Sequence, residues 1–221
     1  MRRMGRDAPI TAQLEPPAAW NTTLSRPPDF LWLKIDRRLI EASSWEPWLR
    51  QVARTRKAVA NFIEDYDPLS NETATCGVLS SAASKVGLLS MTEYLCVKKH
   101  NTDYRRRGVG RADLWVADTD REISWAFEAK QVRCAAGSGQ ATFESAMKAA
   151  CHDASRMTDL EANRFYGLMI ATLPFDHDLD ELDELCEQLD DFAKEVDIAC
   201  KFGGGALPAY AFFRSAQRQK R

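Results

Sequence analysis

Three residues in the middle of the chain have the types that a metal-dependent hydrolytic site needs. Asp113 stands fifteen residues before Glu128, and Glu128 opens a Glu-Ala-Lys tripeptide that ends at Lys130. Carboxylate oxygens are the protein ligands that Mg²⁺ and Mn²⁺ prefer, and Mg²⁺ takes one or two of them together with water and substrate phosphate. A neighbouring lysine can orient or deprotonate water, or neutralise charge that develops on a phosphate. The set therefore suits metal-assisted hydrolysis of a phosphodiester bond.

The segments that carry these residues have the composition and alternation of β-strands. Residues 110–116 and 122–130 are rich in apolar, β-branched and aromatic side chains. Residues 117–121 between them have turn chemistry, so the pair is predicted to form a hairpin. Because a strand alternates its faces, Glu128 and Lys130 share one side of the second strand.

The position of the turn decides whether Asp113 joins them. A turn about residues 119–120 places Asp113 opposite Ala126, on the face of Glu128 and diagonal to it. Diagonal neighbours lie roughly 7–8 Å apart at Cα. A one-residue bulge would send Asp113 to the other face, so the predicted site depends on register.

A fourth acidic residue precedes the hairpin. Residues 74–98 have apolar side chains at helical spacing, which predicts a long helix with Glu93 in its apolar second half. A carboxylate in such surroundings favours a cation or a metal as a neighbour, and the alternative is an exposed helical glutamate.

The remaining pattern predicts a mixed α/β sheet with helices on its faces. We expect a helix at residues 45–65, and residues 30–35 fit either a short strand or an apolar anchor. A first strand is expected near residues 97–103. After the hairpin we expect a helix at 140–157, a buried strand at 165–173, a helix at 179–196 and a last strand at 207–213.

Several basic residues are candidates for phosphate contacts. Four arginines cluster just before and within the first hairpin strand: Arg105, Arg106, Arg107 and Arg111. They would hold phosphates or form a solvated loop. Lys148 belongs to a polar stripe on the helix at residues 140–157, where the alternatives are a solvated face and a phosphate-contacting edge.

The order of these features resembles the PD-(D/E)xK nuclease superfamily, which includes restriction endonucleases, Holliday-junction resolvases and RecB- and lambda-type exonucleases. The resemblance covers residues 74–173 and implies a restriction-endonuclease-like αβββαβ core with an N-terminal helical extension. Its motif is a helix with Glu93, then Asp113, then the tripeptide from Glu128 to Lys130. Alanine at position 112 stands where the family motif has proline.

The resemblance also implies roles for these residues. Asp113, Glu128 and Glu93 would hold Mg²⁺ or Mn²⁺, and Lys130 would be the catalytic lysine. Gln131 or Gln140 is a candidate for the glutamine that some exonuclease-like members place after the tripeptide. We therefore expect a deoxyribonuclease, endo- or exonucleolytic, with DNA as its partner. Many members cut as dimers, so a homodimer is one expectation, and the alternative function is an inactive module that binds nucleic acid or protein.

Composition sets broader limits. The chain has 221 residues, 45% hydrophobic content and a formal net charge of -2, so its total charge does not by itself predict nucleic-acid binding. The six cysteines lack zinc-finger spacing, which favours reduced thiols in a cytoplasmic protein. No apolar run approaches the roughly 20 residues of a membrane span, and no secretory signal is predicted. We expect an irregular Pro-rich arm and helix at 1–70, the nuclease-like domain at 71–215 and a basic tail at 216–221.

Overall fold

The computed structural model describes residues 29–63, 66–100, 105–135, 137–173, 178–203 and 207–216. Most of the predicted Pro-rich arm, residues 1–28, and nearly all of the predicted basic tail, residues 217–221, lie outside this part of the chain. Among the described helices, none is both long enough and apolar enough to cross a membrane. All six cysteines are free thiols.

Seven strands form one mixed sheet in the order β1-β6-β7-β5-β4-β3-β2. Only β4 and β5 run parallel, and every other neighbouring pair in this sheet is antiparallel. The strands are β1 (Phe30–Lys34), β2 (Leu89–Lys99), β3 (Arg107–Asp118), β4 (Ile123–Arg133), β5 (Arg164–Thr172), β6 (Ile198–Phe202) and β7 (Ala209–Ser215). The predicted α/β class with a mixed sheet is confirmed.

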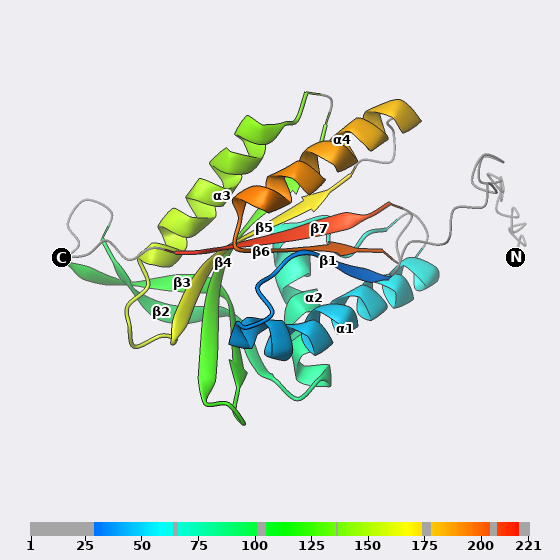
Figure 1. Cartoon of the computed structure of the whole chain (residues 1–221). Helices are drawn as coiled ribbons and strands as arrows, with labels where there is room; N and C mark the ends of the chain where they lie inside the picture. The colour runs from blue at the N-terminus through cyan, green and yellow to red at the C-terminus, as the bar shows by residue number, and fades with distance from the viewer. Residues whose placement is uncertain are drawn as a thin grey trace, which may run out of the picture.

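Four α-helices cover the two faces of the sheet. Figure 1 shows α1 (Ile40–Phe62) and α2 (Glu72–Lys85) on one face, and α3 (Gln140–Ser155) and α4 (Leu179–Phe192) on the other. The helix α3 joins the parallel strands β4 and β5, which need a crossover connection of this kind. The order from α2 to β5 is helix, three strands, helix, strand.

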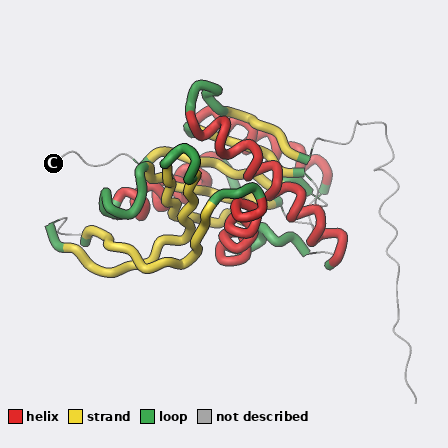
Figure 2. The backbone as a smooth tube through the Cα atoms, turned by 90° about the horizontal axis from the view of Figure 1, so that it is seen from below, coloured by secondary structure: helices red, strands yellow, loops and turns green. Residues whose placement is uncertain are grey.

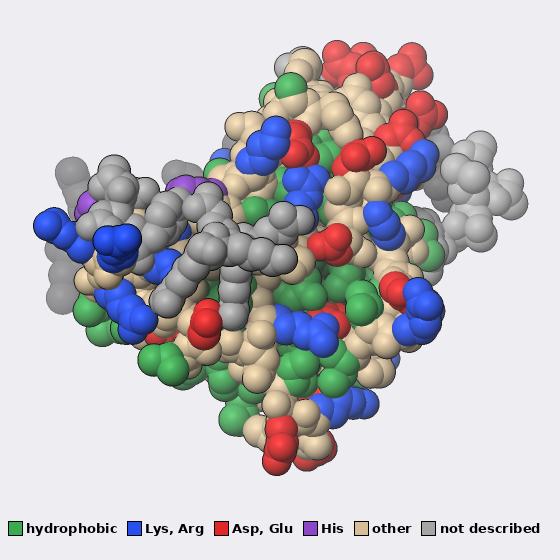
Figure 3. Space-filling view, turned by 60° about the vertical axis from the view of Figure 1, so that its left-hand side comes forward, with side chains coloured by type: hydrophobic (Ala, Val, Ile, Leu, Met, Phe, Trp, Pro, Cys, Tyr) green, Lys and Arg blue, Asp and Glu red, His purple; other side chains and the backbone are tan. Residues whose placement is uncertain are grey.

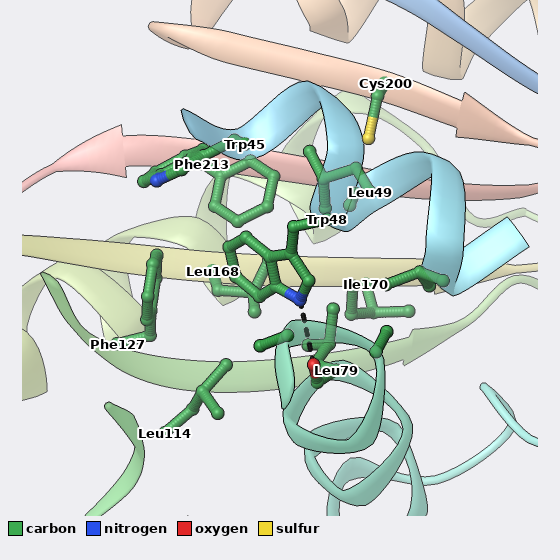
Figure 4. Close-up of a cluster of buried hydrophobic side chains, with 14 of the residues drawn as sticks. Trp45, Trp48, Leu49, Leu79, Leu114, Phe127, Leu168, Ile170, Cys200 and Phe213 are labelled. Atoms are coloured by element: carbon green, nitrogen blue, oxygen red, sulfur yellow. Dashed lines mark hydrogen bonds between the residues drawn. The ribbon is translucent and has the colours of Figure 1, made fainter. Parts of the chain in front are cut away.

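The core on the α1 side is aromatic and closely packed. Trp45 and Trp48 of α1 are fully buried, and their rings lie 5.5 Å and 5.8 Å from that of Phe127 in β4 (Figure 4). The indole N–H of Trp48 donates to the carbonyl of Leu79 in α2 at 2.8 Å. Helix α1 is therefore part of the same core as the central strands, and β1 pairs with β6 in the same sheet.

The predicted helix at residues 74–98 is wrong in its second half. Helix α2 ends at Lys85, and the chain turns at Gly87, whose φ is +87°. The Gly87 N–H donates to the Ser84 carbonyl and the Leu88 N–H donates to the Ala83 carbonyl, which is a Schellman motif. The following residues form strand β2 (Leu89–Lys99), so the first strand also starts earlier than the expected residue 97.

Other predicted boundaries differ less. Residues 30–34, for which strand and anchor were both open, form the edge strand β1. The first helix begins at Ile40 instead of residue 45. Strand β6 was not predicted, because its five residues are too few to show a clear alternation.

Candidate active site at a fork between two strands

Strands β3 and β4 pair over only part of their lengths. Their ladder ends at the Leu114–Phe127 pair. Beyond it, β3 stays paired with β2 as far as Arg107, and β4 stays paired with β5 as far as Arg133. The β2–β3 pair therefore runs away from the rest of the sheet, as Figure 2 shows. The name "fork" is used below for the place at which strands β3 and β4 diverge.

Asp113 lies in the fork, next to the last paired residue of β3. Its Oδ2 accepts the backbone N–H of Ala129 in β4 at 2.7 Å. A side chain thus satisfies a strand donor that β3 no longer reaches. Burial raises the pKa of Asp113 above its usual value, although the Ala129 N–H and the charges of Lys130 and Lys98 act to lower it.

The predicted register of the hairpin needs correction. Asp113 does not lie opposite Ala126, because Trp115 pairs with that residue. The strands join through residues 119–122, with Glu122 at a φ of +52° and its N–H donating to the Thr119 carbonyl at 3.3 Å. The turn is therefore centred one residue later than expected, which shifts every pair by two positions. The ladder stops before Asp113, so its proximity to Glu128 comes from the fork and not from a diagonal pair.

Glu128 is the most deeply buried acidic residue of the fork, with 4% of its surface exposed. Lys98 Nζ lies 2.7 Å from its Oε1, so the two side chains form an ion pair that is largely shielded from solvent. Glycine at position 110 leaves room for Lys98, because an added Cβ would lie 2.9 Å from Lys98 Cδ. Burial first, and the charge of Asp113 second, raise the pKa of Glu128 to about 7 against the opposing effect of Lys98.

Lys130 follows two residues later on the same face of β4. Its Nζ lies 3.5 Å from Oδ2 of Asp153 in α3. Burial acts to lower the pKa of Lys130, but the charges of Glu72, Asp153 and Asp113 outweigh burial, and the pKa is raised. Lys130 is therefore an ammonium ion at neutral pH, which suits it to orienting water and neutralising charge more than to removing a proton.

Glu93 is not on a helix, in contrast to the prediction. It lies in β2 with a φ of +50°, and 45% of its side chain is exposed. Its Oε2 lies 3.5 Å from Nη1 of Arg111. Its charge contributes to the raised pKa of Asp113, so it belongs to the surroundings of the fork.

Glu72 is a carboxylate at the fork that the sequence reasoning missed. It is the first residue of α2, after the N-cap Asn71, whose side chain accepts the Ala74 N–H at 2.8 Å. Burial raises the pKa of Glu72, Asp113 adds to this effect and Lys130 opposes it. The helix-start signal at Asn71 was visible in the sequence, but nothing local showed that this helix end faces the hairpin.

The predicted basic residues divide into two groups. Arg107 and Arg111 lie on β3 beyond the fork and are exposed, and Arg105 and Arg106 immediately precede this strand. Lys148 is 72% exposed on α3, and its Nζ lies 3.6 Å from Oε1 of Glu144. The structure thus places the arginines beyond the fork, along or just before β3, and Lys148 on a solvated helix face.

The two candidate glutamines also differ in position. Gln131 is half-buried on β4, and its Nε2 donates to Thr172 Oγ1 at 3.3 Å. Its backbone acts to lower the pKa of Glu72, which places it beside the fork. Gln140 is exposed as the first residue of α3 and has no contact with the fork carboxylates in the described part of the chain.

The fork offers one buried carboxylate, Glu128, and one half-buried carboxylate, Asp113, to a cation instead of three carboxylates. Within the described residues, no group of three or more His, Cys, Asp and Glu side chains is close enough to hold a metal ion. Asp113 and Glu128 nevertheless fit an ion such as Mg²⁺, which accepts one or two carboxylates and keeps its other positions for water and phosphate. The raised pKa of Glu128 is the strongest sign of this fit, because burial and the charge of Asp113 outweigh the ion pair with Lys98 and leave the carboxylate only partly compensated.

Comparison of the chain with protein-family models, with curated proteins and with solved structures finds no match in any of the three. The interpretation of the fork therefore stands on its own geometry.

Proposed function

We propose that this chain is a metal-dependent nuclease that hydrolyses phosphodiester bonds of DNA, with its active site at the fork. The observation that carries the proposal is the convergence of Asp113 and Glu128 with Lys130, where burial raises both carboxyl pKa values and the charge of Asp113 raises that of Glu128 further. Perturbed carboxyl groups beside a cationic side chain are typical of catalytic sites.

The helix-strand order around the fork supports the proposal as well. The elements α2, β2, β3, β4, α3 and β5 follow the order that the PD-(D/E)xK resemblance implies. In that pattern the first helix contributes a glutamate. Glu72, which lies on α2, takes this place better than the predicted Glu93, which lies on a strand.

Each residue then has a distinct role. Asp113 and Glu128 would hold the metal ion, and Glu72 would accept hydrogen bonds from water around it. A bound Mg²⁺ or Mn²⁺ would supply Lewis-acid polarisation of the scissile phosphate. Lys130, held by Asp153, would donate hydrogen bonds to the attacking water or to a phosphate oxygen.

The position of Lys98 favours a second candidate function, in which the protein binds nucleic acid without cleaving it. The ammonium group of Lys98 lies against Glu128 Oε1, where it neutralises the buried carboxylate and competes with a metal ion. In a nuclease, Lys98 must move away when the metal binds. In a binding module, the Lys98–Glu128 pair would be permanent.

A cleavage assay separates the two candidates. Supercoiled, linear duplex and single-stranded DNA are incubated with Mg²⁺ or Mn²⁺ and, separately, with EDTA. We expect metal-dependent cleavage that falls at least ~10³-fold in Lys130→Ala and in Asp113→Ala, because each removes a group that acts on the reacting phosphate.

The matched controls are Lys194→Ala and Asp191→Ala, which break an exposed ion pair with the same residue types. Both should cleave at the unaltered rate. Cleavage that persists in Lys130→Ala and Asp113→Ala would exclude the fork as the active site.

A further inference from the structure

The β2–β3 pair beyond the fork is much more basic than the rest of the chain. We define the ribbon as residues 94–100 and 105–112. From residue 94 to residue 112 the sequence holds six lysine and arginine residues and one aspartate, whereas the whole chain has a net charge of -2. Figure 3 shows Lys and Arg side chains gathered at the left, where this part of the molecule projects.

The two faces of the ribbon differ in burial. On one face, Cys96 and Ala112 are buried against the core next to α3. On the other face, Leu95 is 72% exposed and Val109 is 78% exposed. We call this second face the outer face. Its side chains come from three cross-strand pairs: Leu95 with Arg111, Val97 with Val109, and Lys99 with Arg107.

The outer face is poorly explained by folding alone. Lys99 and Arg107 are directly opposite each other, and like charges in this position destabilise a sheet. Leu95 and Val109 place apolar surface in water between these cations and Arg111.

We propose that the outer face of the ribbon binds the major groove of duplex DNA beside the cleaved phosphate. This inference deepens the proposed function and rests on it for the position of the cut. A two-stranded ribbon fits a major groove about 12 Å wide. The cations would contact phosphates on the groove walls, and Leu95 and Val109 would contact base edges such as the thymine methyl group.

The geometry also sets how far from the cut this contact lies. Asp113 is six positions after Arg107, which corresponds to about 20 Å of extended strand. At about 3.4 Å per base pair, the ribbon would reach about six base pairs to one side of the scissile phosphate. Duplex DNA on that side is therefore part of the recognised substrate.

Binding is tested without catalysis by fluorescence anisotropy on labelled 24-base-pair duplex DNA and on the matching single strand, both in EDTA. The variant Lys99→Ala/Arg107→Ala/Arg111→Ala should bind the duplex about 10²-fold more weakly at 0.1 M salt. The slope of log affinity against log salt should fall by about 3, because up to three phosphate contacts are lost. The control Arg37→Ala/Arg38→Ala/Lys194→Ala removes the same charge from exposed positions elsewhere and should bind as the unaltered chain does.

The double variant Leu95→Ser/Val109→Ser tests the apolar contact separately. It should weaken duplex binding without changing the salt slope, and thermal unfolding checks that it remains folded. Equal losses in the two triple variants, or preferential binding of the single strand, would overturn the proposal. So would light scattering that shows a dimer converted to a monomer by Leu95→Ser/Val109→Ser, since the outer face would then be a contact between copies of the chain.

The outcome does not depend on cleavage. Ribbon-dependent binding by a protein that does not cleave DNA would keep this inference and overturn the proposed nuclease activity. Cleavage that requires Lys130 but is unaffected by the ribbon variants would keep the proposed nuclease activity and overturn the inference about the ribbon.

Discussion

Two buried glutamates in this protein have opposite surroundings. Glu41 of α1 is fully buried and accepts hydrogen bonds from Trp125 Nε1 at 2.9 Å, from Tyr166 Oη at 3.0 Å and from Arg164 Nη1 at both carboxylate oxygens. Glu128 at the fork is nearly as buried, but its described ionic partner is a single lysine, Lys98, whose Nζ lies 2.7 Å from Oε1.

The difference separates a carboxylate whose hydrogen bonds are complete within the fold from one whose surroundings disfavour its charge. Around Glu41, every donor comes from an element already packed in the core, so the network is complete without any other molecule. Around Glu128, burial raises the pKa of the carboxyl group and the charge of a second carboxylate, Asp113, adds to this effect. A buried acid whose neighbouring acid outweighs its lysine partner would be stabilised further by a bound divalent cation.

The largest effect in this comparison is expected from Glu41→Ala. It leaves the donors of Trp125 and Tyr166 buried without an acceptor and removes the partner of Arg164. The free energy of unfolding should fall by about 4 kcal/mol. Urea unfolding measures it, with Glu187→Ala on the exposed face of α4 as the control that should change by less than about 0.5 kcal/mol. If Glu41→Ala lowers the free energy of unfolding by less than about 1 kcal/mol, the hydrogen bonds of Glu41 do not stabilise the fold as we expect.

A smaller effect of opposite sign is expected from Glu128→Gln. The folded state raises the pKa of Glu128 from 4.5 to about 7, so it binds this proton more tightly than the unfolded chain does. The contribution of this group to stability is therefore greatest below pH 4.5 and is lost as the pH rises to 7. At pH 8 without metal, the loss reaches about 3 kcal/mol.

The measurement is the difference in unfolding free energy between Glu128→Gln and the unaltered chain, in EDTA, from pH 4.5 to pH 8. The variant should gain relative stability steadily over this range, because glutamine does not titrate. A difference that is constant with pH would show that Glu128 is not perturbed in the folded protein.

The hairpin and the shared face of Glu128 and Lys130 could be predicted from the sequence because strand alternation is a local property. Glu128 and Lys130 need only the period of one strand to share a face. The position of Glu93 was predicted wrongly because apolar residues continue at helical spacing past Gly87, which ends the helix. Apolar periodicity alone does not distinguish a helix from a buried strand over such a short length.

The fork itself could not be predicted from local pattern. It depends on where the β3–β4 ladder stops, and that is decided by which strands each of the two partners meets on its other side. The same holds for the long-range neighbours of the site. Lys98 reaches Glu128 and Glu72 faces Lys130 only because the chain brings β2 and α2 to the same fork.

Calorimetric titration with Mn²⁺ alone, at pH 8, tests most directly whether the fork is a metal site. This pH lies above the raised pKa of Glu128, so the carboxylate is ionised in the titrated protein. We predict that the unaltered chain binds Mn²⁺ and that Glu128→Gln weakens the Mn²⁺ affinity at least ~10-fold. Glu72→Gln should weaken the affinity less. The exposed control Glu93→Gln should change the affinity by no more than about 2-fold. Equal Mn²⁺ affinity in the unaltered chain and in Glu128→Gln, or no binding by either, would contradict the account.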